Sequence, residues 1–195
     1  MLNNVFVMTK TPLMGVSKTR LSKEIGFVKS KRLTLNNLEK IRKMFLRRKE
    51  YDVKWYLTPK ATFRSYSFSF VRNIIMQNGK DIGEKIWYLV NRKFCPFILI
   101  GSDIPKINYN IISNSFKKLK TSDVLLGPTF DGGFWLIGFS YKKKIPYPFQ
   151  HIRWSSKHTL KDLIQNLIDL DISYEFTTTL RDIDNSNDYC KNNDI

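Results

Sequence analysis

Phe97-Ile-Leu-Ile-Gly-Ser102 is the stretch of sequence that decides the fold. Its first four residues are all apolar, so both faces of a strand formed here would be apolar. Strands of this kind are typical of parallel sheets covered by helices, because a strand with one face in water alternates apolar and polar residues. The stretch therefore predicts a central strand in an α/β sandwich.

Strand and helix patterns alternate on both sides of this stretch. Apolar residues recur at helical spacing in Thr34–Arg48, Ile82–Asn91, Tyr109–Leu119 and Lys157–Leu170, and a short helix is expected from Ser17 to Lys23. Strand-sized apolar runs occur in Val5–Thr9, Val53–Thr58, Asp123–Gly127, Phe134–Phe139 and Ser173–Thr179, while Val71–Met76 fits a short strand or helix. This alternation predicts one α/β domain over residues 1–195 with a mostly parallel sheet.

The composition is that of a globular protein, with 42% hydrophobic and 26% charged residues among 195. No run approaches the ~20 apolar residues of a membrane-spanning helix. The first residues carry neither a basic region nor a long apolar run, so we expect no signal peptide. Cys95 and Cys190 lie too far apart in the sequence to suggest a disulfide framework or a metal cluster. We therefore expect a reduced, cytoplasmic protein.

The charge is strongly positive, because 33 Lys and Arg residues against 17 Asp and Glu residues give a formal net charge of +16. Such an excess attracts nucleic acid, phosphorylated small molecules or an acidic membrane surface. The basic residues are spread along the chain, however, without an RNA-binding aromatic motif or a helix-turn-helix. We expect a small anionic ligand, and keep a non-catalytic, nucleic-acid-binding α/β domain as an alternative.

A basic loop follows the first expected strand. Ligands of open α/β sheets bind beyond the carboxyl ends of the strands. The loop contains Gly15, which permits close backbone approach, and then Lys18 and Arg20 where a helix begins. Helix starts favour anions, so this segment predicts a phosphate-binding loop. It is not a Walker A loop, because Ser17 rather than Gly precedes Lys18; a solvated basic turn is the alternative.

Carboxylates follow three further strands. Asp103 ends the central strand, where a buried carboxylate needs a cation partner, and Mg²⁺ or Mn²⁺ shared with substrate phosphates would serve; a turn before Pro105 is the alternative. Asp131 precedes two glycines, either beside a ligand or in a plain hairpin turn. Asp182 and Asp184 follow the last strand, and one of them could reach Asp103 and complete a metal site. In the alternative, the residues after them cap a terminal helix.

An ordered set of motifs resembles the DUF2064 group of glycosyltransferase-like proteins. The motifs are Pro12-x-x-Gly15-x-x-Lys18-Thr-Arg-Leu21, Gln77-x-Gly79-x-Asp81-Ile-Gly83-Glu84, Gly101-Ser-Asp-x-Pro105, Gly127-Pro-x-x-Asp131-Gly-Gly, Trp154-Ser155 and Asp182-x-Asp184. They span nearly the whole chain. The group is related to the phospholactate guanylyltransferase family and, more loosely, to the GT-A and nucleotidyltransferase class.

The resemblance implies a GT-A-like, Rossmann-type, three-layer α/β/α fold that binds a nucleotide or nucleotide sugar. It implies that the phosphates are held by Gly15, Lys18 and Arg20. It also implies that Asp103 and Asp184 bind the divalent metal, Mg²⁺ or Mn²⁺.

The same resemblance places Gln77 and Gly79 near the base or ribose, and Asp131 and Gly132 in the acceptor or sugar pocket. The chain departs from the family pattern at Lys85-Ile86, where Arg-Met is usual, and at Asn185, where Thr is usual. Lys85 keeps the charge but lacks the two-pronged donor of Arg. These departures bear on the substrate more than on the fold.

Two transfer reactions need the same parts, because cations must neutralise the charge on the phosphates in both. In glycosyl transfer, Lys18, Arg20 and the metal stabilise the leaving nucleoside diphosphate, and Asp131 acts as the base on the acceptor hydroxyl. In nucleotidyl transfer, the same cations hold an NTP whose pyrophosphate leaves. We expect glycosyl transfer to a small-molecule acceptor, with nucleotidyl transfer to a phosphorylated small molecule as the alternative.

Overall fold

The computed structural model describes residues 2–11, 19–58, 73–92, 94, 96–140, 144–183 and 188. Strands and helices follow one another in the order β1 (Asn3–Lys10), α1 (Thr19–Ile25), α2 (Phe27–Phe45), β2 (Tyr51–Thr58), β3 (Ile74–Met76), α3 (Ile82–Asn91), β4 (Phe97–Gly101), α4 (Tyr109–Lys118), β5 (Val124–Pro128), β6 (Phe134–Phe139), α5 (Thr159–Asp169) and β7 (Tyr174–Phe176).

In the described part of the chain the strands form a seven-stranded sheet in the order β3-β2-β1-β4-β6-β5-β7. β3, β2, β1 and β4 are parallel neighbours, and β5 is parallel to β7. β6 runs antiparallel to β4 and β5, because the hairpin turn around Asp131 reverses the chain after β5. The predicted mostly parallel sheet is confirmed, and β4 lies at its centre, as Phe97–Ser102 indicated.

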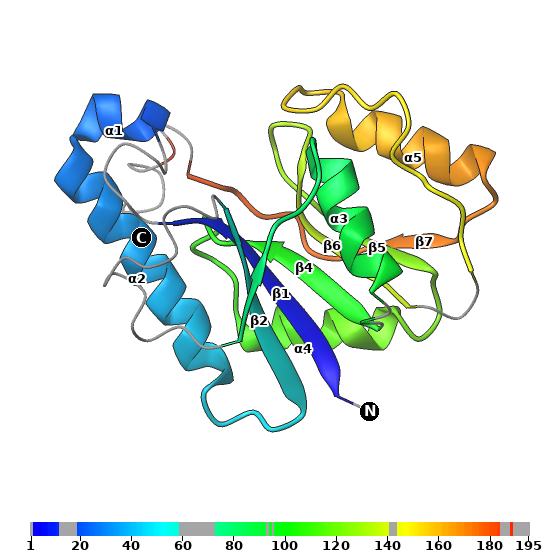
Figure 1. The fold of residues 1–195 in the computed structure, drawn as a ribbon, viewed down its shortest axis with the longest axis horizontal. Coiled ribbons are helices and arrows are strands. Elements are labelled where there is room, and N and C mark those ends of the chain that lie inside the picture. The colour runs from blue at the N-terminus through cyan, green and yellow to red at the C-terminus, as the bar shows by residue number, and fades with distance from the viewer. Residues whose placement is uncertain are drawn as a thin grey trace.

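The sheet has an apolar cluster on each face, because successive residues of a strand point to opposite sides. In β1, Val5 and Val7 join one cluster and Phe6 joins the other. Helices α2 and α4 cover the first face, and α3 and α5 cover the second, as Figure 1 shows. This arrangement confirms the expected three layers.

Helix α2 begins earlier than predicted, at Phe27 rather than near Thr34. Its first two turns lack the apolar repeat, because the buried positions there are the small polar residues Ser30 and Thr34. Thr34 suits this position because its Oγ1 donates to the Ser30 carbonyl at 3.0 Å, which satisfies the hydroxyl within the helix. None of the helices in the described ranges is long and apolar enough to span a bilayer.

The carboxyl ends of the parallel strands meet along one edge of the sheet. Lys10, the last residue of β1, pairs with Thr58, the last residue of β2, and Met8 of β1 pairs with Gly101 of β4. The segments that follow these strands therefore converge on one place, which is where ligands of open α/β sheets bind.

Candidate functional site

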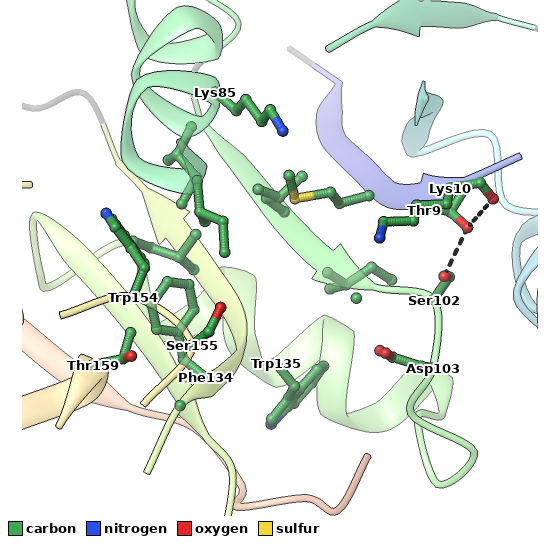
Figure 2. Close-up of a pocket in the computed structure, with 18 of the residues that line it drawn as sticks. Thr9, Lys10, Lys85, Ser102, Asp103, Phe134, Trp135, Trp154, Ser155 and Thr159 are labelled. Atoms are coloured by element: carbon green, nitrogen blue, oxygen red, sulfur yellow. Dashed lines mark hydrogen bonds between the residues drawn. The ribbon is translucent and has the colours of Figure 1, made fainter. Parts of the chain in front are cut away.

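A cleft of about 800 Å³ opens at this edge. Its floor is formed by the ends of β1, β2 and β4, and its walls by α1, α3, the start of β6 and the start of α5. Figure 2 shows Thr9 and Lys10 from β1, Ser102 and Asp103 after β4, and Lys85 from α3 around the same space.

A hydrogen-bonded corner joins β1 to the loop after β4. The Ser102 hydroxyl donates to Thr9 Oγ1 at 2.9 Å, and the Thr9 hydroxyl donates to the Lys10 carbonyl at 3.1 Å (Figure 2). Asp103 follows directly. A Cβ added to Gly101 would lie 2.9 Å from Asp103 Oδ1, so the glycine leaves the room that this carboxylate occupies.

The segment after β7 runs beside Asp103, because the Ile183 amide donates to the Asp103 carbonyl at 3.2 Å. Asp182 and Asp184 flank Ile183 in the sequence, so the predicted approach of this segment to Asp103 is seen in the backbone. Asp184 itself lies outside the described residues. In the ranges described, no group of three or more His, Cys, Asp or Glu residues is arranged to hold a metal ion.

The carboxylate of Asp103 fits one kind of metal site. Fewer than three carboxylates gathered at one place do not form an all-protein cage, but Mg²⁺ is usually bound through one or two carboxylates together with substrate phosphates. Asp103, in the space left by Gly101, offers an oxygen ligand of that type on the floor of the cleft. The residues present are therefore compatible with a metal shared with a bound phosphate.

Gln77 is buried where β3 ends, and its side-chain amide ties the sheet edge together. Nε2 donates to the carbonyls of Tyr56 at 2.8 Å and Thr9 at 3.3 Å. Both of these bonds use the amide nitrogen, so they join β3 to β1 and β2. Gln77 lines the cleft, as the resemblance led us to expect of a residue near the base or ribose.

Tyr56 positions helix α3 against the sheet. Its buried hydroxyl donates to the Lys85 carbonyl at 2.8 Å and accepts from the Asn78 amide at 3.4 Å. Burial raises the pKa of Tyr56 to about 12, so the hydroxyl remains a donor at physiological pH. Since this bond uses only the Lys85 main chain, the Lys85 ammonium is left to reach into the cleft (Figure 2).

Gly79 does not line the cleft. It has φ +135°, and a Cβ there would lie 2.7 Å from the Lys85 amide nitrogen. The glycine therefore allows the tight turn that starts α3, where the Asp81 side chain accepts from the Glu84 amide at 2.8 Å. Its place in the motif is explained by this turn.

Asp131 lies at the mouth of the cleft and holds the β5–β6 turn. Its Oδ1 accepts from the Thr129 hydroxyl and from the Gly133 amide, the latter at 3.1 Å. Both of the roles foreseen for Asp131, in a hairpin and beside a ligand, are thus compatible with its place.

Gly132 serves the same turn and does not line the cleft. Its Cα faces the Lys157 carbonyl so closely that a Cβ would lie 2.2 Å from that oxygen, and its own carbonyl accepts from the Leu160 amide at 2.9 Å. The absence of a side chain at Gly132 therefore lets the β5–β6 turn pack closely against the start of α5.

Three aromatic residues, Phe134, Trp135 and Trp154, line the cleft as an aromatic wall. In Figure 2 Trp135 lies near Asp103, and Phe134 and Trp154 lie farther from it. The Trp154 ring lies edge-on to Phe134, with centroids 6.4 Å apart, and Trp135 Nε1 donates to the Thr178 carbonyl at 2.9 Å. Ser155, next to Trp154, also lines the cleft and has φ +54°, a conformation uncommon for a residue with a side chain.

Four of the predicted site residues line this one cleft: Arg20, Gln77, Asp103 and Asp131. Gly79 and Gly132 shape its borders, and Gly15, Lys18 and Asp184 lie outside the described residues.

The prediction missed several lining residues, above all Lys10, together with Thr58, Ser102 and Lys157. Lys10 and Thr58 end parallel strands, so the carboxyl-end rule could have named them. Lys157 could not be found that way, because it lies just before α5 and not at the carboxyl end of a parallel strand. Among the described lining residues, Lys10, Arg20, Lys85 and Lys157 are cationic, whereas Asp103 and Asp131 are the carboxylates. The cleft therefore suits an anionic ligand.

Comparison with known proteins agrees with this geometry. The model of a family described as "Uncharacterized protein conserved in bacteria (DUF2064)" matches residues 46–156, which include α3, β4, the Asp131 turn and Trp154. The chain belongs to the DUF2064 family. No curated protein matches the sequence.

Solved structures share the fold of this DUF2064 chain. A protein from Desulfovibrio desulfuricans G20, described as a candidate nucleotide-diphospho-sugar transferase, has a TM-score of 0.86 at 24% identity, over 95% of this chain and 84% of that one. CMP:2-keto-3-deoxy-manno-octonic acid synthetase complexed with CTP has a TM-score of 0.54 at 10% identity, and the match covers 98% of this chain and 96% of that one. The bifunctional IspDF of Campylobacter jejuni has a TM-score of 0.59 at 10% identity, and the match covers 98% of this chain and 54% of that longer chain. These likenesses establish the GT-A-like fold.

Proposed function

We propose that this chain is a transferase that binds a nucleotide sugar in the cleft and transfers the sugar to a small acceptor. The observation that carries the proposal is the meeting of four cations with Asp103 at the carboxyl ends of β1 and β4. A nucleoside diphosphate carries the negative charge that such a lining would neutralise. The fold shared with the Desulfovibrio protein supports the same class of donor.

In this proposal, Lys10, Arg20 and Lys85 bind the phosphates from three sides, and Lys18 adds a further cation from its loop. The Gln77 Oε1 accepts a hydrogen bond from the base or ribose. A divalent metal, held by Asp103 and Asp184 and by the phosphates, would supply positive charge to the leaving diphosphate. Lysine and arginine donors fixed before the reaction stabilise the same charge without reorganisation.

The acceptor enters beside the aromatic wall, and Asp131 acts as the base. The acceptor hydroxyl oxygen forms a bond to the anomeric carbon of the sugar, and the bond from that carbon to the diphosphate breaks. The hydroxyl proton passes to Asp131, whose Oδ2 is not used in the two turn hydrogen bonds. Trp154 and Phe134 supply an apolar surface on which a sugar ring can pack.

Nucleotidyl transfer is the second candidate, and the turn role of Asp131 is compatible with it. The hydrogen bonds from Thr129 and Gly133 give Asp131 a structural role through Oδ1 that does not require the residue to act as a base. In nucleotidyl transfer a phosphorylated substrate attacks the α-phosphate of an NTP, and pyrophosphate leaves with the electron pair of the broken P–O bond. The attacking phosphate is already ionised, so that reaction needs no base at Asp131.

A thermal-shift titration separates the two candidates. Purified protein is titrated with UDP-glucose, GDP-mannose, CTP and GTP, each with and without Mn²⁺. A ligand at about 100 times its Kd adds about 2.7 kcal/mol to the free energy of unfolding. For a chain of this size that amount raises Tm by about 5 to 10 °C. Metal-dependent stabilisation by a nucleotide sugar is the result expected.

The variant Asp103→Asn tests the assignment of the site. It should lose the metal-dependent shift and keep the Tm of the ligand-free protein, because the carboxylate lies at the cleft and not in the core. Asp169→Asn, at the far end of α5, is the matched control and should behave as the wild type. Stabilisation by NTPs alone would move the assignment to nucleotidyl transfer. No shift with any nucleotide would contradict both candidates.

A further inference from the structure

Helix α2 carries a basic stripe on its outer face. The stripe consists of Lys29, Arg32, Asn36, Lys40 and Lys43, all of them exposed. These positions are three or four residues apart, so their side chains lie in one row along the helix. The opposite face supplies Leu38, Ile41 and Phe45 to the core, which fixes the stripe toward solvent.

The stripe remains positive after its local ion pairs are taken into account. Glu39 is the single acidic residue of α2. Arg42 binds it with two hydrogen bonds of 2.7 and 2.8 Å, and this lowers the pKa of Glu39, so the carboxylate is ionised and already compensated. Lys43 lies 3.8 Å from the same carboxylate, while Lys40 donates to a backbone carbonyl. The cations therefore exceed what the helix itself neutralises.

Exposed apolar side chains lie at both ends of this stripe. At the start of α2, Val28 is 73% exposed; just after its end, Leu46 is 62% exposed. Large apolar side chains are costly in water, and they add nothing to contacts with a phosphate backbone. Binding to a membrane surface increases both with the apolar area buried and with the attraction of cations to anionic lipids, so cations beside exposed apolar residues favour this partner.

We propose that the outer face of α2 docks on an anionic lipid bilayer with the helix axis parallel to the surface. Val28, four residues before Arg32, and Leu46, three residues after Lys43, lie beside the stripe and enter the boundary between headgroups and acyl chains. The lysines and Arg32 contact anionic headgroups. From Lys29 to Lys43 the stripe extends for roughly 20 Å, enough to contact several lipids at once. Charge complementarity, with a net charge of +16 on the chain, selects this partner.

Docking would bring the cleft close to the membrane. Thr34, on the inner side of α2, lines the cleft, so the cleft would lie about one helix diameter, roughly 10 Å, from the lipid surface. The proposal is independent of the transferase chemistry, because bilayer binding can be measured without any nucleotide.

Flotation with lipid vesicles tests the proposal. The protein is mixed with vesicles of phosphatidylcholine alone, or of phosphatidylcholine with about one third phosphatidylglycerol. We expect binding to the anionic vesicles only, and a loss of binding as NaCl is raised. Each cation near an anionic surface strengthens binding about fivefold, so Lys29→Ala/Arg32→Ala should weaken it about 25-fold.

The apolar contribution is tested with Val28→Ser/Leu46→Ser, which should weaken vesicle binding about tenfold or more. Matched controls remove similar groups elsewhere: Ile168→Ser on α5, which is 56% exposed, and Lys117→Ala/Lys120→Ala at the end of α4. The controls should bind as the wild type does. Circular dichroism and Tm verify that each variant is folded.

Three results would overturn the proposal. The first is an absence of binding to anionic vesicles, or binding that the Lys117→Ala/Lys120→Ala control weakens as much as the stripe variant does. The second is binding to poly-uridine that competes with vesicles and is unchanged in Val28→Ser/Leu46→Ser, which would assign the stripe to nucleic acid. The third is a dimer in solution that this variant dissociates, which would assign the apolar residues to a second copy of the chain.

Discussion

Gly132 and Gly26 have the same backbone torsion, φ +88°, but different surroundings. Around Gly26 nothing lies within 4 Å of where a Cβ would be, whereas at Gly132 the Lys157 carbonyl oxygen would be 2.2 Å away. The two glycines share a positive φ but differ in whether a Cβ would collide with another segment of the chain.

Alanine at each glycine should give different losses of stability. Gly26→Ala should lower the free energy of unfolding by about 2 kcal/mol, because φ +88° with ψ 151° is a conformation that residues with a Cβ hardly adopt. Gly132→Ala should lower it by about 3 kcal/mol or more, because the Lys157 main chain must also move. Urea unfolding of both variants measures the difference. Equal losses would contradict the close packing of the Asp131 turn against the start of α5.

The role of Gly132 illustrates what the sequence could not tell. The Asp131-Gly-Gly pattern indicated both a turn and a ligand pocket, and the motif correctly marked the mouth of the cleft. It could not indicate that Gly132 meets Lys157, because that contact joins segments that are far apart in the chain. Asp103 was easier to find, since a carboxylate directly after a buried strand is visible in the local pattern.

Helix α3 brings Lys85 to the cleft, and its N-cap decides where the helix starts. Asp81 accepts from the Glu84 amide at 2.8 Å, and Asn108 caps α4 in the same way at 3.1 Å to the Ile111 amide. Removal of either cap should cost about 1 kcal/mol of stability, or about 2 to 4 °C in Tm. The two caps differ in function, because only the start of α3 borders the cleft.

We therefore predict that Asp81→Ala weakens binding of whichever nucleotide stabilises the wild type, while Asn108→Ala leaves it unchanged. Ile82 and Lys85 both line the cleft, and fraying of the first turn moves them. Isothermal titration of the two variants, matched in stability, measures the effect. If both variants lose affinity equally, the loss reflects general stability and the positioning role of Asp81 is wrong.

The start of α5 depends on an ion pair with a defined pH response. Arg153 donates to Asp162 from Nε at 2.9 Å, from a terminal nitrogen at 2.7 Å and from its amide at 3.1 Å. Hydrogen bonds from the Arg153 side chain lower the pKa of Asp162 from 3.8 to about 2. A depressed carboxyl pKa in the folded state stabilises the protein above the unfolded pKa, and that stability is lost as the pH falls through the folded value.

Asp162→Asn should accordingly have a lower Tm than the wild type near neutral pH, and the gap should close between about pH 4 and about pH 2. Other groups change the Tm of both proteins equally as the pH falls. The difference between the two Tm values at each pH therefore reports on Asp162. A gap of constant size over this range would show that the carboxylate stabilises the helix start without being ionised.

The bounds of some helices were predicted more accurately than those of others, and their residues explain the difference. The bounds of α3 were predicted correctly, because Ile82, Ile86, Leu89 and Val90 form a clear helical repeat after a capping Asp. The start of α2 was missed, because Ser30 and Thr34 are buried there without being apolar. A repeat of apolar residues can predict a helix only where the buried positions of that helix are apolar.

At the scale of the whole molecule, the sequence predicted the three layers but not the order of the strands. β6 is inserted antiparallel between β4 and β5. Its residues Trp135–Phe139 are buried, as in β4, so the pattern is that of any central strand. The turn at Asp131 gives the reversal of direction, but only long-range packing places β6 beside β4.

The net charge of +16 is also a property of the whole chain, and it opposes folding. Like charges repel more strongly in the compact state than in the unfolded chain, and salt screens that repulsion, with a Debye length of about 10 Å at 0.1 M. We predict that Tm rises by a few degrees as NaCl is raised from about 0.02 M to about 0.5 M.

The variant Lys29→Ala/Arg32→Ala separates self-repulsion from other effects of salt. Both residues lie near the N-terminus of α2, where the helix dipole also disfavours cations, and both are exposed. The variant should have a higher Tm than the wild type at low salt, and the two should converge at high salt because both effects are screened. A Tm that stays level or falls as NaCl rises would mean that the basic residues are already compensated within the fold, and the anion attraction argued for the cleft and for α2 would then have to be weaker than the formal charge suggests.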